Sequence, residues 1–243
     1  MKTVAIIQAR MGSTRLPGKV LKDLAGDTVL ARVVNRTRRA RLVDQVVVAT
    51  SVLPSDDVIV KECERLGVDC FRGDEADVLD RYYQAAQQFL ADIVVRITSD
   101  CPLIDPELID ITVAAFLERL VDYATNALVP TYPPGLDVEV FGFEALGRAS
   151  KFADKPYQRS HVTPYLYENP GFFKVLSMGA DADYSRYRWT LDTREDLNML
   201  REIYSRLGER YDAGWREVLT MVENAPELQS LNSHVAQKAL QEG

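Results

Sequence analysis

The stretch "AIIQARMGSTRLPGKVL", residues 5–21, joins a run of apolar residues to a loop rich in glycine and positive charge. Residues 4–9 read as a fully buried strand that stops at the polar Gln8. The loop that follows holds two glycines, a proline and two hydroxyl side chains. It also carries four cations, Arg10, Arg15, Lys19 and Lys22. A cationic loop directly after a buried strand indicates a site for an anion.

Short apolar strands alternate with helical patterns through the first 120 residues. We predict strands at 4–9, 45–50, 69–71 and 92–98, and helices at 28–40, 57–66, 76–90 and 106–120. This alternation is typical of an α/β protein whose mostly parallel sheet has helices on both faces. Ligands of such folds bind at the carboxyl ends of the strands. The loop at 10–19 and the segment "SDCP" at 99–102 should therefore lie at the same edge of the sheet.

The pattern is less regular after residue 123. We predict a loop and a strand within 129–141, a helix at 156–167, a strand at 173–178, a strand over "RYRWTLDT" ending near Asp192, a helix at 193–208 and one or two weaker helices in the last thirty residues. Residues 1–243 are interpreted as a single domain with an inserted lobe at about 125–185.

Composition excludes several classes of protein. The 243-residue chain has a formal net charge of −7, which disfavours non-specific nucleic-acid binding. The ten-residue segment 32–41 is basic, but valines at helical spacing make it a solvated helix face. Three scattered cysteines, Cys63, Cys70 and Cys101, are too few for a zinc site or a disulfide framework. We see no signal peptide and no apolar run of about 20 residues, so we expect a cytoplasmic protein without a membrane partner.

The loop at 10–19 does not match the two best-known phosphate loops. Gly12 and Gly18 enclose five residues where a Walker loop has four, and Gly-x-Gly-x-x-Gly is absent. The loop still suits a triphosphate. Gly12 allows close backbone approach, Ser13 and Thr14 offer hydroxyls, and the cations Arg10, Arg15 and Lys19 supply charge. The alternative is a solvated cationic loop between the first strand and its helix.

The motif "QARMGSTRLPGKVL" resembles the signature of the sugar-activating cytidylyltransferases, the CMP-Kdo and CMP-sialic acid synthetases. The spore-coat polysaccharide biosynthesis branch matches best. The similarity extends over about residues 3–208, through "FRGDEADVLDRYYQAA" (71–86), "RITSDCPLIDP" (96–106), "GLDVEVF" (135–141), "QRSHVTPYLYENP" (158–170) and "LDTREDL" (191–197). It implies a Rossmann-like nucleotide-diphospho-sugar transferase fold and, as in related enzymes, a homodimer joined through the lobe.

The resemblance also implies a metal site built from two distant aspartates. Asp100 and Asp192 match the family's metal ligands, and both follow apolar, strand-like runs. Mg²⁺ suits such a site because it takes one or two carboxylates together with waters and phosphate oxygens. CMP-sialic acid synthetases carry a further aspartate where this chain has Thr190. Asp137 is a third candidate. Turns and helix caps are the alternative for Asp100 and Asp192, and an exposed loop carboxylate is the alternative for Asp137.

The remaining site residues follow from the same resemblance. Gln8, Ala9, Gly73 and Arg81 match regions that approach the base, although strand burial or a helix-surface cation would explain them equally well. Arg159 and His161 could meet an acidic or polyhydroxylated sugar, although a structural histidine is the alternative.

We therefore predict a Mg²⁺-dependent cytidylyltransferase that transfers CMP from CTP to an acidic surface-polysaccharide sugar and releases pyrophosphate. Arg10, Lys19 and Asp100 would act in catalysis. The alternatives are an enzyme that uses another nucleoside triphosphate and a non-catalytic nucleotide-binding subunit. A glycosyltransferase shares the fold type, but its metal site usually includes an Asp-x-Asp element, and we regard this alternative as weaker.

Overall fold

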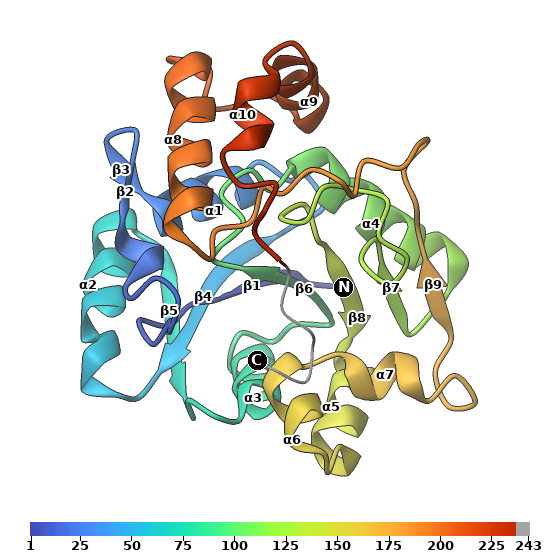
Figure 1. Cartoon of the computed structure of the whole chain (residues 1–243). Coiled ribbons are helices and arrows are strands. Elements are labelled where there is room, and N and C mark those ends of the chain that lie inside the picture. Colours follow the sequence, from blue (N-terminus) through green and yellow to red (C-terminus); the bar gives the residue numbers. More distant parts are fainter. Residues whose placement is uncertain (237–243) are drawn as a thin grey trace.

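The computed structural model describes residues 1–236 and is built around a seven-stranded sheet (Figure 1). The strands lie in the order β5 (Asp69–Gly73), β4 (Gln45–Ser51), β1 (Thr3–Gln8), β6 (Ile93–Thr98), β8 (Glu139–Gly142), β7 (Tyr123–Thr125) and β9 (Val175–Ser177). Strand β8 runs antiparallel to β6 and β7, and every other neighbouring pair is parallel. The predicted mostly parallel sheet is therefore confirmed.

Helices cover both faces of the sheet, as predicted (Figure 1). One face packs against α1 (Val29–Thr37), α2 (Asp57–Leu66), α4 (Pro106–Arg119), α8 (Arg194–Leu207), α9 (Trp215–Glu223) and α10 (Pro226–Ser230). The other face packs against α3 (Val78–Gln88), α5 (Phe143–Phe152) and the short helix α7 (Pro164–Glu168). The short helix α6 (Pro156–His161) lies against α3. Side chains of β1 alternate between the two cores: Ala5 and Ile7 enter the first, and Val4 and Ile6 the second.

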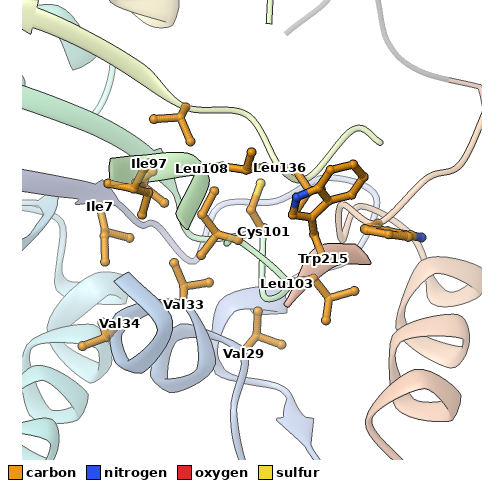
Figure 2. Packing of buried hydrophobic residues seen from close by; sticks show 14 of the residues in the cluster. Ile7, Val29, Val33, Val34, Ile97, Cys101, Leu103, Leu108, Leu136 and Trp215 are labelled. Atoms are coloured by element: carbon orange, nitrogen blue, oxygen red, sulfur yellow. The ribbon is translucent and has the colours of Figure 1, made fainter. Parts of the chain in front are cut away.

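The first core fixes the loops that end β1 and β6. Figure 2 shows Val33 and Val34 of α1 beneath Ile7 of β1 and Ile97 of β6. All four side chains are almost completely buried. Each contributes roughly 1.5–3 kcal/mol when fully removed from water. The two loops that leave these strands are therefore anchored at the same edge of the sheet, where the sequence places them.

The first helix begins one residue later than predicted because residue 28 serves as its cap. Residues 23–28 form a small hairpin, β2 (Asp23–Leu24) and β3 (Asp27–Thr28), that the sequence pattern did not indicate. The Thr28 hydroxyl accepts a hydrogen bond from the Ala31 amide at 3.0 Å. This contact satisfies one of the unpaired N–H groups of the first turn of α1.

The strand predicted over "RYRWTLDT" is wrong. The Trp189 amide donates to the Pro134 carbonyl at 2.8 Å, and the Leu191 amide donates to the Asp100 carbonyl at 2.8 Å. These partners lie on two different loops, so the extended segment has no neighbouring strand with which to form a ladder.

The single helix predicted at 156–167 is also wrong. It is divided into α6 and α7 at Val162, which has φ of 74°. Pro164 begins α7 and lacks the N–H that a continuous helix would need. The segment 125–185 contributes β8 and β9 to the sheet and α5, α6 and α7 to the second face. Within residues 1–236, every helix is too short or too polar to cross a bilayer.

Candidate active site

Lys19 connects two carboxylates that are far apart in the sequence. It begins the 3₁₀ turn η1 (Lys19–Leu21) at the end of the glycine-containing loop. Its Nζ atom donates to Asp100 Oδ2 at 2.6 Å and to Asp192 Oδ1 at 2.8 Å. A third bond, of 2.8 Å, reaches the Leu191 carbonyl. The structure thus brings together the predicted loop cation and both predicted metal ligands.

Mutual charge keeps this cluster ionised. Burial acts to lower the pKa of Lys19, but the Asp100 and Asp192 carboxylates outweigh it and leave that pKa raised. Burial likewise acts to raise the pKa of Asp100, and Lys19 outweighs it, so that pKa is lowered. At neutral pH Lys19 therefore stays protonated and Asp100 stays ionised.

The donor set of this cluster fits Mg²⁺. Asp100 and Asp192 present carboxylate oxygens to a single position, now taken by the Lys19 ammonium. Residues 1–236 contain no preformed group of three acidic, histidine or cysteine ligands. A site for Mg²⁺ does not need one, because this ion is usually bound by one or two carboxylates together with substrate phosphates and waters.

Two arginines surround Asp192. Arg15 from the loop and Arg188 both reach its Oδ2 atom at 2.9 Å. Arg188 also contacts Asp196 Oδ1 at 2.9 Å, and Asp196 is completely buried. Sequence reasoning missed Arg188 and Asp196. The capping box at Thr193, in which Asp196 binds the Thr193 amide, was the available signal that Asp196 is fixed in place.

Backbone hydrogen bonds close the loop at 10–19 into a tight turn. The Met11 carbonyl accepts from the amides of Ser13 and Gly18, and Gly18 has φ of 66°. The Ser13 hydroxyl accepts from the Leu16 amide at 3.3 Å, so it serves the loop itself. Thr14 and Gly12 are exposed. The predicted loop residues therefore share one turn, with Gly12 at its surface.

Arg10 lies at the other end of the loop and contacts Glu75. Its Nη1 atom is 3.5 Å from Glu75 Oε1. A Cβ atom at Gly12 would lie 3.2 Å from the same carboxylate oxygen. Glu75 therefore sits beside the exposed backbone of the loop, and Arg10 is not part of the Lys19 cluster in this structure.

Arg81 is a buried guanidinium close to Gly73. The residue is only 1% exposed, and its Nη1 atom donates to the Asp74 carbonyl at 2.9 Å. Its Nε atom is buried and has no hydrogen-bond partner within residues 1–236. Loss of hydration lowers the pKa of Arg81. A Cβ atom at Gly73 would lie 3.0 Å from Arg81 Cγ, so the glycine leaves room for this side chain.

Gln8 ends β1, and Ala9 follows it and enters the first core. The Ala9 amide donates to the Ala49 carbonyl at 3.1 Å, and Ala9 is buried. The Gln8 side-chain oxygen accepts from Arg96 Nε at 3.2 Å. Arg96 in turn is ion-paired with Glu139. Sequence reasoning did not identify this pair, since it joins two strands that are distant in the chain.

The predicted sugar-binding residues lie on α6. The Arg159 guanidinium is ion-paired with Asp77 and donates to the Ser150 carbonyl at 2.6 Å. These contacts connect Arg159 to α3 and α5. His161 is the last residue of α6.

Asp137 lies on a loop that is packed against the segment carrying Asp192. Gly135 has φ of 109°, and a Cβ atom there would lie 2.6 Å from the Trp189 backbone. Asp137 is exposed on one side. Loss of hydration raises the pKa of Asp137 to about 6, and the negative charges of Glu139 and Asp100 raise it further. The hydrogen bond from the Gly135 amide acts in the opposite direction and lowers the pKa. The Thr190 hydroxyl donates to the Asp100 carbonyl at 3.4 Å.

The chain contains one Asp-x-Asp sequence, Asp181–Asp183. Both carboxylates are exposed, Asp181 pairs with Arg216 at 3.3 Å, and Asp183 accepts from the Ser185 amide. Neither contacts the Lys19 cluster. The arrangement expected of a metal-dependent glycosyltransferase is therefore not formed by these two residues.

Comparisons with known proteins agree with this geometry. The spore coat polysaccharide biosynthesis protein SpsF of Bacillus subtilis is 34% identical over 229 residues, which is 91% of this chain and 94% of that protein. The 3-deoxy-manno-octulosonate cytidylyltransferase of Geobacter sulfurreducens is 42% identical over 121 residues, 49% of this chain and 47% of that protein. A solved cytidylyltransferase structure from Leptospira borgpetersenii superposes with a TM-score of 0.92 at 33% identity, covering 98% of this chain and 100% of that one.

The resemblance of the motifs and the Rossmann-like nucleotidyltransferase fold are thereby confirmed. A family model described as cytidylyltransferase matches residues 4–238, which is nearly the whole chain. The chain therefore belongs to the cytidylyltransferase family and is a nucleotidyltransferase.

Proposed function

We propose that this enzyme transfers CMP from CTP to a hydroxyl group of a sugar, with release of pyrophosphate, and that Mg²⁺ assists. The single observation that carries the proposal is the contact of Lys19 with both Asp100 and Asp192. One cation from a glycine-containing loop and two acids from distant loops meet at the carboxyl edge of a parallel sheet. That is the arrangement a nucleoside triphosphate and its ion need.

The loop cations would bind the triphosphate. Arg15 and Lys19 are held by Asp192 and Asp100 and would turn to the phosphates when these carboxylates acquire another positive partner. Arg10 would exchange the exposed Glu75 carboxylate for a phosphate oxygen. Gly12 lets the triphosphate approach the backbone. An arginine binds phosphate with two parallel N–H groups, whereas lysine supplies a compact charge.

Asp100 and Asp192 would hold Mg²⁺, which supplies charge neutralisation and alignment of the phosphates when bound. The protein's own contribution is placement. The sugar hydroxyl attacks the α-phosphorus, the bond to the β-phosphate oxygen breaks, pyrophosphate leaves, and the hydroxyl proton passes to water. Lys19, Arg10 and Arg15 stabilise the charge that gathers on the transferred and leaving phosphates. Each such donor contributes roughly 3 kcal/mol to lowering the barrier.

The buried guanidinium of Arg81 supports a role in base recognition. Its Nε–H group has no partner within the described chain, although a buried donor left unsatisfied costs roughly 1–3 kcal/mol. Gly73, which has no side chain, makes room for the Arg81 side chain itself. An acceptor atom of cytosine, such as O2 or N3, would complete this hydrogen bond. The backbone of Gln8 and Ala9, at the end of β1, is proposed to approach the same nucleotide.

The relatives suggest the wider setting. SpsF is a spore coat polysaccharide biosynthesis protein, so we propose a sugar destined for a surface polysaccharide as the acceptor. Arg159 and His161 are retained as candidate sugar contacts. Localisation to the cytoplasm and assembly as a homodimer through residues 125–185 are part of the same proposal.

The experiment that tests the function measures pyrophosphate release with each nucleoside triphosphate in turn, in the presence of Mg²⁺ and a panel of sugars. We expect release with CTP at least tenfold faster than with GTP, UTP or ATP, and none without a sugar. Preference for another triphosphate would reassign the base. Tight CTP binding without turnover on any sugar would instead support a non-catalytic nucleotide-binding subunit.

A further inference from the structure

Arg96 holds a polar cluster next to the proposed nucleotide site, on the face of the sheet that carries the second core. Its guanidinium is ion-paired through Nη1 with Glu139 and donates through Nε to Gln8 Oε1 at 3.2 Å. The other Glu139 oxygen accepts from the hydroxyls of Tyr123 at 2.7 Å and Thr163 at 2.5 Å. Both carboxylate oxygens of Glu139 therefore have partners, and two of the three guanidinium nitrogens of Arg96 are hydrogen-bonded.

The free groups of this cluster can be assigned from donor chemistry. A guanidinium only donates, so the Gln8 atom that meets Arg96 must be the amide oxygen, and the Gln8 NH₂ group points elsewhere. The Arg96 hydrogen bonds within residues 1–236 use Nε and Nη1 and leave Nη2 without a partner, and the Arg96 side chain is 14% exposed. Gln8 is itself partly exposed. The cluster therefore presents two adjacent N–H donors to solvent.

Asp137 supplies a hydrogen-bond acceptor on the same side. Leu136, Val138 and Val140 all enter the first core, so Asp137 and Glu139 alternate to the opposite face, where Arg96 lies. The packing of Gly135 against Trp189 fixes this loop beside the segment that ends at Asp192. Asp137 makes no ion pair within the described chain, and its only recorded hydrogen bond is with the Gly135 amide at 3.4 Å.

The position of the cluster connects it to the reaction. The Ser99 amide donates to the Gln8 carbonyl at 3.1 Å, so Gln8 lies directly beside the loop that carries Asp100. Arg96 and Glu139 are paired across β6 and β8, on the side of β1 away from Gly73 and Arg81. A nucleotide whose base lies at Arg81 and whose phosphates lie at Lys19 would leave this side for the second substrate.

We propose that Gln8, Arg96 and Asp137 form the acceptor subsite of the enzyme and recognise uncharged hydroxyl groups of a sugar. A hydroxyl both donates and accepts, which suits two N–H donors that face a carboxylate. Glu139 neutralises Arg96, whereas Asp137 keeps its charge, so the subsite is negative overall and repels a carboxylate on the acceptor. This replaces the acidic sugar expected from the resemblance, and it rests on the proposed function.

The test separates binding of the acceptor from binding of CTP. KM values for both substrates are measured by pyrophosphate release in wild type, Gln8→Leu, Gln8→Glu and Asp137→Asn, with the exposed Asp154→Asn as a matched control. We expect about a tenfold rise in the KM of the acceptor in the first three variants, and a change of less than twofold in the KM of CTP. Asp154→Asn should match wild type.

Gln8→Glu distinguishes recognition from a structural role. The new carboxylate strengthens the contact with Arg96 but removes the NH₂ donor, so a purely structural Gln8 would leave the KM of the acceptor unchanged. An unchanged KM of the acceptor in Gln8→Glu and Asp137→Asn overturns the subsite. Melting temperature and CTP binding by calorimetry verify that the variants are folded.

The charge preference is tested with N-acetylglucosamine and 3-deoxy-manno-octulosonate as probes in the wild-type enzyme. Faster turnover of the uncharged sugar supports the subsite, and a clear preference for the sugar acid overturns it. Failure of the proposed function is a different result, namely no CTP-dependent pyrophosphate release from the wild type with any sugar.

Discussion

At the scale of single residues, Lys19 keeps two carboxylates together that would otherwise repel each other. Its side chain is 13% exposed, and those of Asp100 and Asp192 are 23% and 16% exposed. The contacts are therefore screened less than those of a surface ion pair. The same arrangement explains how a metal ion with its triphosphate could replace the ammonium group between the two acids.

Replacing Lys19 should make the melting temperature of the protein depend on the concentration of Mg²⁺. In Lys19→Met the cation between the two carboxylates is lost, and Asp100 keeps no ion-pair partner within residues 1–236, so we expect the free energy of unfolding to fall by about 2 kcal/mol. Millimolar Mg²⁺ should then raise the melting temperature of the variant more than that of wild type, because binding to the native state stabilises it. Scanning calorimetry with and without Mg²⁺ measures this. Lys61→Met, at an exposed position of α2, is the control. An equal response to Mg²⁺ in all three proteins would contradict the prediction.

The raised pKa of Asp137 leads us to expect that the stability of the protein depends on pH. Its pKa is about 6 in the native state, above the ordinary value of 3.8, so the native state binds this proton more tightly than the unfolded chain does. Ionisation as the pH rises from about 4 through about 6 therefore reduces stability. Asp137→Asn should be more stable than wild type at pH 8 by about 1 kcal/mol, a figure reduced for the solvent exposure of the side chain. The difference should disappear at pH 4. Thermal melting at the two pH values tests this, and a stabilisation that is equal at both would refute it.

At the scale of elements, the loop of Gly135 fixes the position of the segment before α8. Gly135→Ala combines a positive φ of 109° with a Cβ atom 2.6 Å from the Trp189 backbone, so the two segments must separate. We expect a loss of at least 3 kcal/mol in the free energy of unfolding, or a folded protein with strongly reduced activity.

Gly171→Ala provides the matched control for this loop. Gly171 has an ordinary φ and nothing within 4 Å of its would-be Cβ, so the substitution should be tolerated. Chemical denaturation of both variants gives the comparison. Equal stability of the two would show that the close approach at Gly135 does not matter.

The elements that the sequence predicted correctly are those whose signals are local. Apolar runs bounded by turn residues located β1, β4, β5 and β6, and helical periodicity with Gly67 as a stop located α2. The segment 186–192 has an equally strand-like pattern, but whether it joins a sheet depends on a neighbour that the pattern does not contain. The division of α6 from α7 was signalled locally by Pro164, which the helical reading of 156–167 overlooked.

In the candidate site, too, the residues with local sequence signals were predicted, and those that depend on distant contacts were missed. The loop cations and both aspartates were identified because motifs and strand ends mark them, and the structure places Lys19, Asp100 and Asp192 in contact. Arg188, Asp196, Arg96 and Glu139 were missed because their importance arises from contacts between distant segments. The pairing of Arg159 with Asp77, likewise, depends on how α6 packs against α3.

At the scale of the whole molecule, exposed aromatic residues within residues 125–185 lead us to expect self-association. Phe152 and Phe172 are 56% and 68% exposed, and both lie within residues 125–185. Strand β9 forms one edge of the sheet in the same region. We expect light scattering to give twice the chain mass of 27.4 kDa, and Phe172→Asp to weaken association. A wild-type protein that remains monomeric at micromolar concentration would contradict this expectation.

Asp100, Asp192 and Lys19 are proposed to form one centre for the triphosphate and its ion. The most direct measurement is the rate of Mg²⁺-dependent pyrophosphate release by Asp100→Asn, with CTP and an accepted sugar, beside wild type and Asp154→Asn. We expect a loss of at least a hundredfold in Asp100→Asn, with a nearly unchanged melting temperature, and full activity in Asp154→Asn. Wild-type activity in a correctly folded Asp100→Asn enzyme would contradict it.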